Sequence, residues 1–464
     1  MSVALQRSAP RPDVRIVHLG LGAFHRAHQA WYTAQAADGW GIAAFTGRSA
    51  AAAQTLNAQD GLFTLVTRGP EGDRFETIES IAAAYAASDL EAMRDLLARD
   101  STAIVTLTIT EAGYKVITVA GQPALDTQDP DVQYDQVALA KHFGTGEPVS
   151  ELRTAPARIL LGLAARQAAH GKALAIVSCD NLPGNGAVTR AAVLGFATGL
   201  DAALSDWITA NVSFVDTSID RITPRTTEAD RDTVAAETGF QDASPVVTEP
   251  FTSWVIQGEF PAGRPAWEKA GALFVDDLEP FERRKLWLLN GAHTLMAYAG
   301  QLRGHETVAQ ALADQRINQW VQEFWDAAAA HLKEPGLDIP GYRRALAARF
   351  ANPRIAHYLA QIGIDGSLKL AARAIPVYRA ERAAGRAGTA ALRPIAAWCD
   401  QLTAQHAAGV EVSDAQSSAL ETVLADTPES REQTMALLKV LDAQLAGEEH
   451  AVDGVHQLRN GFTS

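Results

Sequence analysis

The amino-acid sequence predicts an α/β fold in the first part of the chain and a mostly α-helical second part. Short, apolar, β-branched runs alternate with helix-like stretches, which is typical of a parallel sheet covered on both faces. These runs are residues 14–22, 103–110 and 172–180. After about residue 280, apolar residues recur at helical spacing without a strong strand pattern. We therefore predict two domains, residues 1–278 and residues 279–464.

The elements follow in order along the chain. Residues 14–22 indicate a buried strand that enters a glycine turn, and residues 27–38 carry a helical pattern. Gly39 and Gly41 end that helix, and the sequence GIAAFTG predicts the next strand. Residues 210–275 are rich in Thr, Pro and Asp, and here we expect an irregular region with extra strands or an extension of the sheet.

Composition excludes several classes of function. The chain has 464 residues, of which 47% are hydrophobic and 20% charged, so it is long enough and apolar enough to fold around a real core. Its net charge of −14 disfavours nucleic-acid binding, and no apolar run reaches the length of a membrane span. Cys179 and Cys399 lie far apart without a zinc-ligand pattern. We expect a cytoplasmic protein without a metal site that acts on a small molecule as a monomer or homodimer.

The glycine turn has the pattern G-x-G-x-x-H. Two glycines suit a tight strand-to-helix turn and a close approach of the backbone to a pyrophosphate, and the helix N-terminus favours the negative charge. Ordinary turn chemistry is the alternative. His25 replaces the third glycine of the dinucleotide pattern, so we expect helix and strand to pack less closely there. The candidate cofactor contacts are Gly20, Gly22, Ala23, Phe24, His25 and Arg26, the last as a direct cation.

The end of the second strand bears on the choice between NAD and NADP. A carboxylate at this place usually holds the adenosine ribose of NAD. This chain has Arg48 and Ser49 instead. Both side chains suit a ribose phosphate, so NADP is not excluded. The alternative is a solvated loop arginine.

A lysine-containing helix carries the clearest pattern of chemistry. With Lys285 at zero and about 100° per residue, Glu282 falls at ~60°, His293 at ~80° and Asn290 at ~140°. These four polar residues share one side of an otherwise apolar helix, which favours a catalytic face over a solvated one. A desolvated lysine can take a hydroxyl proton, and an amide can donate to a developing alkoxide.

A second candidate follows the strand at residues 172–180, in the sequence SCDNLPGNG. Ligands of doubly wound folds bind at the carboxyl ends of strands, where Asn181 would supply another amide donor. Asn and Gly are also ordinary turn residues. We interpret Cys179 as a small buried hydrophobe, because nothing nearby in the sequence would activate its thiol.

Six segments together resemble the polyol-specific long-chain dehydrogenase/reductase family, which includes mannitol 2-dehydrogenase, D-arabinitol dehydrogenase and fructuronate reductase. The segments recur in order over roughly residues 14–375. They are IVHLGLGAFHRAHQAWYT, TLTITEAGY, SCDNLPGNG, DRITP, KLWLLNGAH and IDGSLKLAAR. The resemblance implies a Rossmann-type N-terminal domain, a mostly α-helical C-terminal domain, and zinc-independent hydride transfer between NAD(P) and a polyol or ketose.

The resemblance also implies a role for each matching residue. Lys285 would be the general base, Asn181 and Asn290 the oxyanion donors, and His293 a substrate-binding partner. Glu282 would belong to a proton path. The implied substrate contacts are Asp220, Lys369 and Arg373, and the residues near the nicotinamide are Thr108, Thr110 and Glu111. Some relatives carry an acidic residue near the position of Ser49, and this chain does not.

Three hypotheses follow. The first is a polyol dehydrogenase, acting on D-mannitol and D-fructose or on D-arabinitol and D-xylulose. The second is a hexuronate reductase that converts D-fructuronate to D-mannonate, with Arg373 or Lys369 holding the substrate carboxylate. The third, of another class, is a nucleotide-binding sensor without catalysis, which the intact set of Lys285, Asn290, His293 and Asn181 disfavours.

Overall fold

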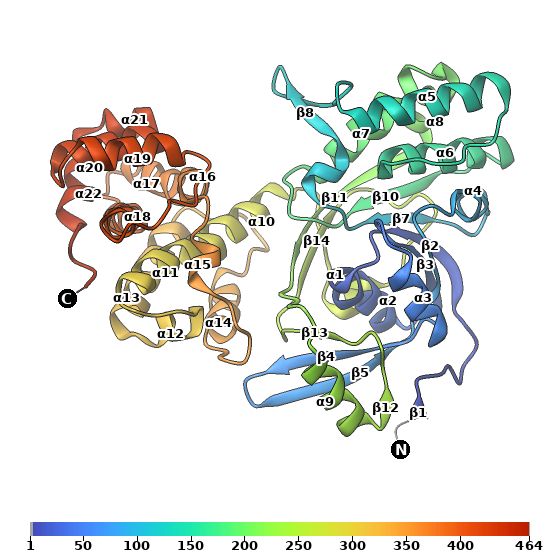
Figure 1. Cartoon of the computed structure of the whole chain (residues 1–464), viewed down its shortest axis with the longest axis horizontal. Coiled ribbons are helices and arrows are strands. Elements are labelled where there is room, and N and C mark those ends of the chain that lie inside the picture. Colours follow the sequence, from blue (N-terminus) through green and yellow to red (C-terminus); the bar gives the residue numbers. More distant parts are fainter. Residues whose placement is uncertain (1–2, 464) are drawn as a thin grey trace. The chain divides into compact units, whose positions relative to one another are not determined.

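The computed structural model describes residues 3–463, and the chain divides into two compact units, Met1–Leu278 and Glu279–Ser464. The first unit is an α/β structure and the second is helical (Figure 1). This confirms the predicted fold class. Each unit is described by itself below.

The first unit is built on an eight-stranded sheet with the order β15-β14-β11-β10-β7-β2-β3-β6. Six neighbouring strands are parallel: β2 (Asp13–Leu19), β3 (Trp40–Phe45), β6 (Ile81–Tyr85), β7 (Ile104–Leu107), β10 (Leu174–Ser178) and β11 (Val212–Asp220). Counted along the chain, their spatial order is 3-2-1-4-5-6, which is that of a Rossmann sheet. The order reverses between β2 and β7, so the carboxyl ends of these two strands flank the switch point.

Alternating side chains of the strands form a core on each face of the sheet. Val17 of β2 packs with helices α4 (Leu90–Leu97), α6 (Ala155–Ala169) and α7 (Asn185–Thr198). Ile16 faces the other side, against the helices that follow the glycine turn. Those helices are α1 (Ala23–His25), the π-helix η1 (Arg26–Ala30), α2 (Trp31–Ala36) and α3 (Ala51–Ala58). α5 (Pro130–Thr145) and α8 (Ala202–Asn211) complete the helices of the first face.

The predicted strands are present, and the irregular region extends the sheet as expected. There, β14 (Ser253–Gln257) pairs antiparallel with β11, and β15 (Leu273–Phe274) pairs with β14. The sequence analysis did not find the smaller sheets. They consist of β4 (Phe63–Gly69), β5 (Gly72–Ile78) and β13 (Val246–Thr248); of β8 (Val116–Val119) and β9 (Gln122–Leu125); and of β1 (Val3–Ala4) and β12 (Phe240–Gln241). Helix α9 (Glu228–Thr238) and the 3-10 turns η2 (Glu111–Tyr114) and η3 (Trp267–Ala270) lie between strands in the chain.

The second unit is a helical assembly around α11 (Gly291–Leu302), whose first ten residues are all buried. Helix α11 is approached closely by its neighbours, because a Cβ on Gly291 would lie 2.5 Å from Phe324 and one on Gly300 2.5 Å from Leu359. The other elements are α10 (Glu279–Arg284), the π-helix η4 (Lys285–Asn290), α12 (Val308–Ala313), α13 (Gln315–Ala329), α14 (Ile339–Phe350), α15 (Leu359–Ile362), α16 (Gly366–Arg373), α17 (Ile375–Ala383), α18 (Thr389–Ala407), α19 (Ser417–Asp426), α20 (Arg431–Leu441), α21 (Ala443–Ala446) and α22 (Glu449–Leu458).

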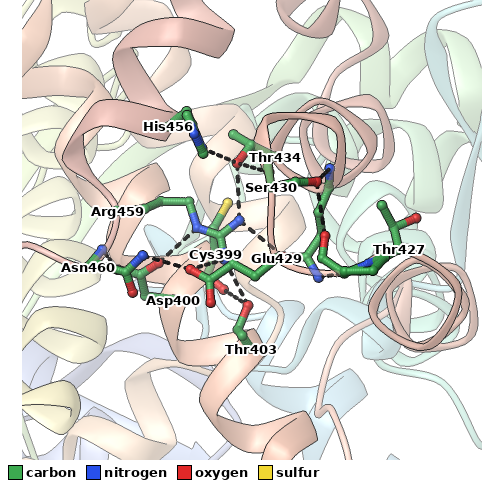
Figure 2. Close-up of polar contacts among 12 residues, drawn as sticks. Cys399, Asp400, Thr403, Thr427, Glu429, Ser430, Thr434, His456, Arg459 and Asn460 are labelled. Atoms are coloured by element: carbon green, nitrogen blue, oxygen red, sulfur yellow. Dashed lines mark hydrogen bonds and ion pairs between the residues drawn. The ribbon is translucent and has the colours of Figure 1, made fainter.

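A buried ion pair between Arg459 and Asp400 joins the end of the chain to α18 (Figure 2). Helix α18 packs along α11. The Arg459 guanidinium donates from Nε to Asp400 at 2.9 Å and from Nη2 to the Thr403 hydroxyl at 2.9 Å. Its Nη1 donates to Gln433 and Thr434 at 3.2 and 3.1 Å. Burial raises the pKa of Asp400 even with Arg459 beside it. Neither charged group is solvated, so each depends on the other to offset the free-energy cost of its burial.

The replacement Asp400→Ala is therefore expected to lower the free energy of unfolding by about 3–5 kcal/mol. It removes the buried partner of the Arg459 guanidinium and leaves only the partly exposed Glu429 carboxylate, at 3.6 Å, as a counter-charge. Urea denaturation of the whole chain, followed by circular dichroism, measures the change. The matched control is Asp453→Ala, which breaks a surface pair with Arg431 at 2.6 Å. It is expected to cost less than about 1 kcal/mol. Equal losses in the two variants would contradict the prediction.

Candidate functional site

The glycine turn lies at the switch point of the sheet. Gly20 has a φ of 106°, and a Cβ there would lie 2.1 Å from the carbonyl oxygen of Thr108. The backbone N–H groups of Gly20 and Leu21 both donate to the carbonyl of Phe45, at 2.9 and 2.8 Å. Only glycine fits at position 20, because its backbone conformation and the neighbouring chain both exclude a side chain.

Gly22 differs, because the protein itself leaves room for a side chain there. A Cβ on Gly22 would meet only the carbonyl oxygen of Gly20, at 3.6 Å, and Gly22 has an extended φ of −138°. The local structure therefore does not require glycine, whereas close approach of a ligand to the backbone would. Helix α1 begins directly after it.

Arg26 contacts protein atoms within the first unit. Its Nε donates to the carbonyl of Gly22 at 3.2 Å, and its Nη1 donates to the hydroxyl of Ser244 at 2.7 Å and to the Ser244 carbonyl. Burial lowers its pKa to about 10. The structure thus shows Arg26 fixing the glycine turn to the loop before β13, and its contact with a pyrophosphate stays a prediction.

His25 fills the place of the missing third glycine with its own ring. The imidazoles of His18 and His25 stack with their centroids 3.3 Å apart, and both rings are fully buried. His18 Nδ1 shares a hydrogen bond with the Thr106 hydroxyl at 2.8 Å. Burial lowers the pKa of His18 to about 3 and that of His25 well below its ordinary value, so both rings are neutral. At the position of the third glycine the structure thus has a buried, stacked histidine pair.

A cavity of about 480 Å³ opens at the carboxyl ends of β7, β10 and β11. Its lining brings together five of the predicted residues, which are Phe24, Thr108, Thr110, Glu111 and Asn181. Cys179 also lines the cavity and is fully buried, as predicted from the sequence. Burial raises its pKa well above the ordinary value, so the thiol stays protonated. Asp220 ends β11, opposite Ser253 of β14, and Arg48 is exposed beyond the end of β3.

The second set of predicted residues lies on one continuous helical segment of the other unit. Glu282 ends up on α10, Lys285 and Asn290 bound the π-helix η4, and His293 lies on α11. The prediction assumed a regular α-helix, and this was wrong for residues 285–290. In a π-helix the hydrogen bonds run from i to i+5, so the turn is wider and the angles taken from 100° per residue do not apply. Lys285, Asn290 and Glu282 are each partly buried.

Side chains from neighbouring helices stabilise the π-helix. The Trp325 indole of α13 donates to the carbonyl of Leu288 at 2.7 Å. The carbonyl of Asn290 accepts from the Thr294 hydroxyl at 3.0 Å and from Arg373 Nη1 at 3.4 Å. Backbone groups displaced from the regular α-helical pattern thus have partners, which a buried helix needs.

His293 and Arg373 come together beside this segment. The His293 ring lies 4.7 Å from the Phe350 ring and 4.8 Å from the His357 ring. Burial lowers the pKa of His293 well below its ordinary value, and the charges of His357, Arg349 and Arg373 lower it further, so the ring is neutral. Its buried Nε2 has no hydrogen-bond partner within the described chain. Burial also lowers the pKa of Arg373 to about 10 and that of Lys369, one turn earlier on α16.

The sequence analysis missed several residues that surround these two sets. Arg349 and His357 come from α14 and from the segment before α15, and no motif marks them. In the first unit, Tyr114 donates a hydrogen bond to Asp180, the neighbour of Asn181. Both residues stand inside quoted motifs, but their pairing across 66 positions left no pattern in the sequence.

Within residues 3–463, none of the helices combines the length and the apolar character that a membrane span requires. The same part of the chain contains no group of three or more His, Cys, Asp or Glu side chains placed to hold a metal ion.

Comparison with known proteins identifies the family. The family model for the mannitol dehydrogenase Rossmann domain matches residues 14–269, and that for the mannitol dehydrogenase C-terminal domain matches residues 277–459. The chain belongs to the mannitol dehydrogenase family. Members of this family are oxidoreductases that act on the CH–OH groups of polyols. The predicted family and enzyme class are thereby confirmed.

Three relatives of the chain within the mannitol dehydrogenase family show how far the similarity extends. The D-mannonate oxidoreductase of Escherichia coli K12 is 36% identical, over 80% of this chain and 76% of its own length. The mannitol 2-dehydrogenase of Cereibacter sphaeroides is 35% identical, over 94% and 92%. The solved structure of Pseudomonas fluorescens mannitol 2-dehydrogenase, a ternary complex with NAD and D-mannitol, is 34% identical with a TM-score of 0.74, over 97% of this chain and 94% of that one.

The two glycines of the turn are expected to respond differently to alanine. Gly20→Ala should lower the thermal unfolding midpoint, because the new Cβ clashes with the Thr108 carbonyl and the φ of 106° strains an L-residue. Gly22→Ala, its matched control, should unfold as the wild type does. Differential scanning calorimetry measures both. A wild-type midpoint for Gly20→Ala would show that the turn adjusts, against the prediction.

Proposed function

We propose that this mannitol dehydrogenase family member transfers a hydride between NAD and a secondary alcohol of a polyol, with D-mannitol and D-fructose as the first pair and D-arabinitol and D-xylulose as the second. The observation that carries the proposal is the presence, in one chain, of a dinucleotide turn with an open Gly22 and of an apolar π-helix bounded by the polar residues Lys285 and Asn290. Relatives named for mannitol 2-dehydrogenase activity support it.

The residues of the first unit fit a dinucleotide. Gly20 and Gly22 bring the backbone to the start of a helix, where N–H groups favour a pyrophosphate. Thr108, Thr110 and Glu111 line the cavity beside the turn. When bound there, the nicotinamide supplies the hydride acceptor and donor. Because Arg48 is exposed where a ribose-binding carboxylate is usual, NADPH is the alternative coenzyme.

The polar side chains supply the rest of the chemistry. Lys285 takes the proton of the substrate hydroxyl during oxidation and returns it during reduction. The amides of Asn181 and Asn290 donate hydrogen bonds to the oxygen as negative charge develops on it. His293 is neutral, so its ring offers one donor and one acceptor to a hydroxyl. Glu282 lies one turn before the lysine and passes the proton towards water.

The broader expectations belong to the same proposal. Residues 1–278 bind the cofactor and residues 279–464 supply the general base. Asp220 and Lys369 contact substrate hydroxyls. The protein works in the cytoplasm as a monomer or homodimer, without zinc.

Lys285→Ala is expected to lower turnover by about 10²–10⁴-fold, the usual contribution of general acid–base catalysis, because no other group on the segment takes the hydroxyl proton. The dissociation constant for NADH, measured by fluorescence quenching, should change less than about twofold, since Lys285 belongs to the other unit of the chain. Steady-state kinetics of ketose reduction give the turnover. Wild-type turnover in this variant would rule out Lys285 as the base.

A hexuronate substrate is the second candidate, and one observation favours it. Arg373 and Lys369 lie on the same helix, and neither forms an ion pair with a carboxylate in the described part of the chain. The guanidinium of Arg373 instead donates to a hydroxyl and a carbonyl. A substrate carboxylate would be a strong partner for it. The relative named D-mannonate oxidoreductase agrees with this candidate.

The substrate test compares D-fructose, D-xylulose, D-fructuronate and D-tagaturonate with NADH and NADPH. We expect the largest kcat/KM for a neutral ketose with NADH. Arg373→Gln should then raise the KM for D-fructose by less than about tenfold, as the loss of one hydrogen bond would. A uronate preference that Arg373→Gln abolishes would replace the polyol assignment with the hexuronate one. A matched variant, Arg379→Gln on the neighbouring helix α17, should leave kcat/KM unchanged for both the neutral ketose and the uronate.

A further inference from the structure

The loop that carries Asn181 is closed by the carboxylate of the residue before it. Asp180 Oδ1 accepts the backbone N–H of Leu182 at 2.9 Å and the Asn185 side-chain amide at 3.3 Å. The first bond makes an Asx turn with Asn181 at its centre. The carboxylate of Asp180 therefore sets the backbone orientation from which the Asn181 amide projects.

The other oxygen of this carboxylate is held by a buried tyrosine. The Tyr114 hydroxyl donates to Asp180 Oδ2, and Tyr114 is fully buried. Tyr114 ends the 3-10 turn η2, and η2 begins at Glu111, on the rim of the same cavity that Asn181 lines. One hydrogen bond thus joins the rim after β7 to the rim after β10.

The far end of the loop is fixed as well. The side chain of Asn185 is completely buried and pairs with the backbone of Thr217 in β11, accepting from its N–H and donating to its carbonyl, both at 3.0 Å. Asn185 is thereby held against the sheet. On the η2 side of the cavity, the Tyr114 hydroxyl restrains Asp180, the residue before Asn181.

We propose that Tyr114 is a positioning residue for catalysis, which fixes the Asn181 amide through the carboxylate of Asp180. The proposal rests on the proposed function, in which Asn181 donates to the developing oxyanion. A catalytic donor has to be held within about 0.5 Å of its place, and Asn181 lies on an exposed loop at the rim of the cavity. The Tyr114 hydroxyl is buried, so donating to the Asp180 carboxylate replaces a hydrogen bond that water would otherwise provide.

The hydrogen bond between Tyr114 and Asp180 also affects the pH at which the Asp180 carboxylate is protonated. Burial raises the pKa of Asp180, the Tyr114 hydrogen bond opposes this, and the Glu111 carboxylate on η2 adds to the rise. Cys179 faces Asp180 from the loop itself and stays neutral. Without the hydroxyl, the pKa of Asp180 is higher, so Asp180 takes up its proton at a higher pH and the charge-assisted turn weakens there.

Tyr114→Phe is expected to lower kcat for ketose reduction by about tenfold or more, because a displaced oxyanion donor loses part of a contribution of about 10²–10³-fold. The dissociation constant for NADH should stay within about twofold, and the acid limb of the kcat–pH profile should move to higher pH. The matched control is Tyr32→Phe, another fully buried tyrosine of this unit, whose hydroxyl accepts from Thr252 at 3.1 Å. It should keep the wild-type kcat and acid limb.

A double-mutant cycle separates this inference from the function on which it rests. If Tyr114 acts through Asn181, then adding Tyr114→Phe to Asn181→Ala lowers kcat less than about twofold further. If the double variant instead loses kcat by the product of the two single losses, the positioning role is overturned. It is also overturned if Tyr114→Phe keeps the wild-type kcat and acid limb while Asn181→Ala has a lowered kcat. A wild-type kcat in Asn181→Ala alone would instead overturn the proposed role of Asn181.

A second variant covers the case in which Tyr114→Phe does not fold. Asp180→Asn keeps the size of the side chain and an acceptor for the Leu182 N–H, but it removes the charge. It should lower kcat and flatten the acid limb, with NADH binding retained. An unchanged kcat and acid limb in Asp180→Asn would contradict the proposal.

Discussion

The close approach of two chain segments at the switch point of the sheet is the constraint on which the first unit depends. The turn after β2 passes so near the end of β7 that a Cβ on Gly20 would lie 2.1 Å from the Thr108 carbonyl oxygen. The same turn is joined to β3 through the Phe45 carbonyl. Three strand ends are thereby held together. The cavity beside them exists because the parallel strands all deliver their loops to one edge.

The second constraint is that every buried polar group needs a hydrogen-bond partner or has to be neutral. The π-helix η4 is retained because its carbonyls find partners such as the Trp325 indole, and the stacked His18 and His25 are tolerated because both are neutral. A regular helix would need fewer outside donors. The wider turn changes the direction in which Lys285 and Asn290 project, and π-helical turns occur frequently at functional sites. A second π-helix, η1, follows the glycine turn in the other unit.

Sequence patterns predicted what depends on local chemistry. The strands β2, β7 and β10 were found because each is a short apolar run, and the glycine turn was found because its conformation demands glycine. The π-helix was not predicted, since it is stabilised by the hydrogen bond from Trp325 to the carbonyl of Leu288, 37 positions away. The Tyr114–Asp180 bond and the contact of Arg373 with Asn290 join residues 66 and 83 positions apart. Such pairs become visible only when the chain is folded, because neither partner is unusual in its own segment.

The choice between a neutral and an anionic substrate depends on the charge of Arg373 and on the groups that already contact it. Burial lowers its pKa to about 10, so the protein already destabilises its charge relative to water. Its present partners, the Thr294 hydroxyl and the Asn290 carbonyl, carry dipoles and no net charge. A ligand hydroxyl would add another dipole and leave the guanidinium partly unsatisfied. A carboxylate would restore a full counter-charge, but it would lose its own hydration on entry. The preference between a uronate and a polyol therefore depends on whether the carboxylate can accept from two nitrogens of the Arg373 guanidinium at once.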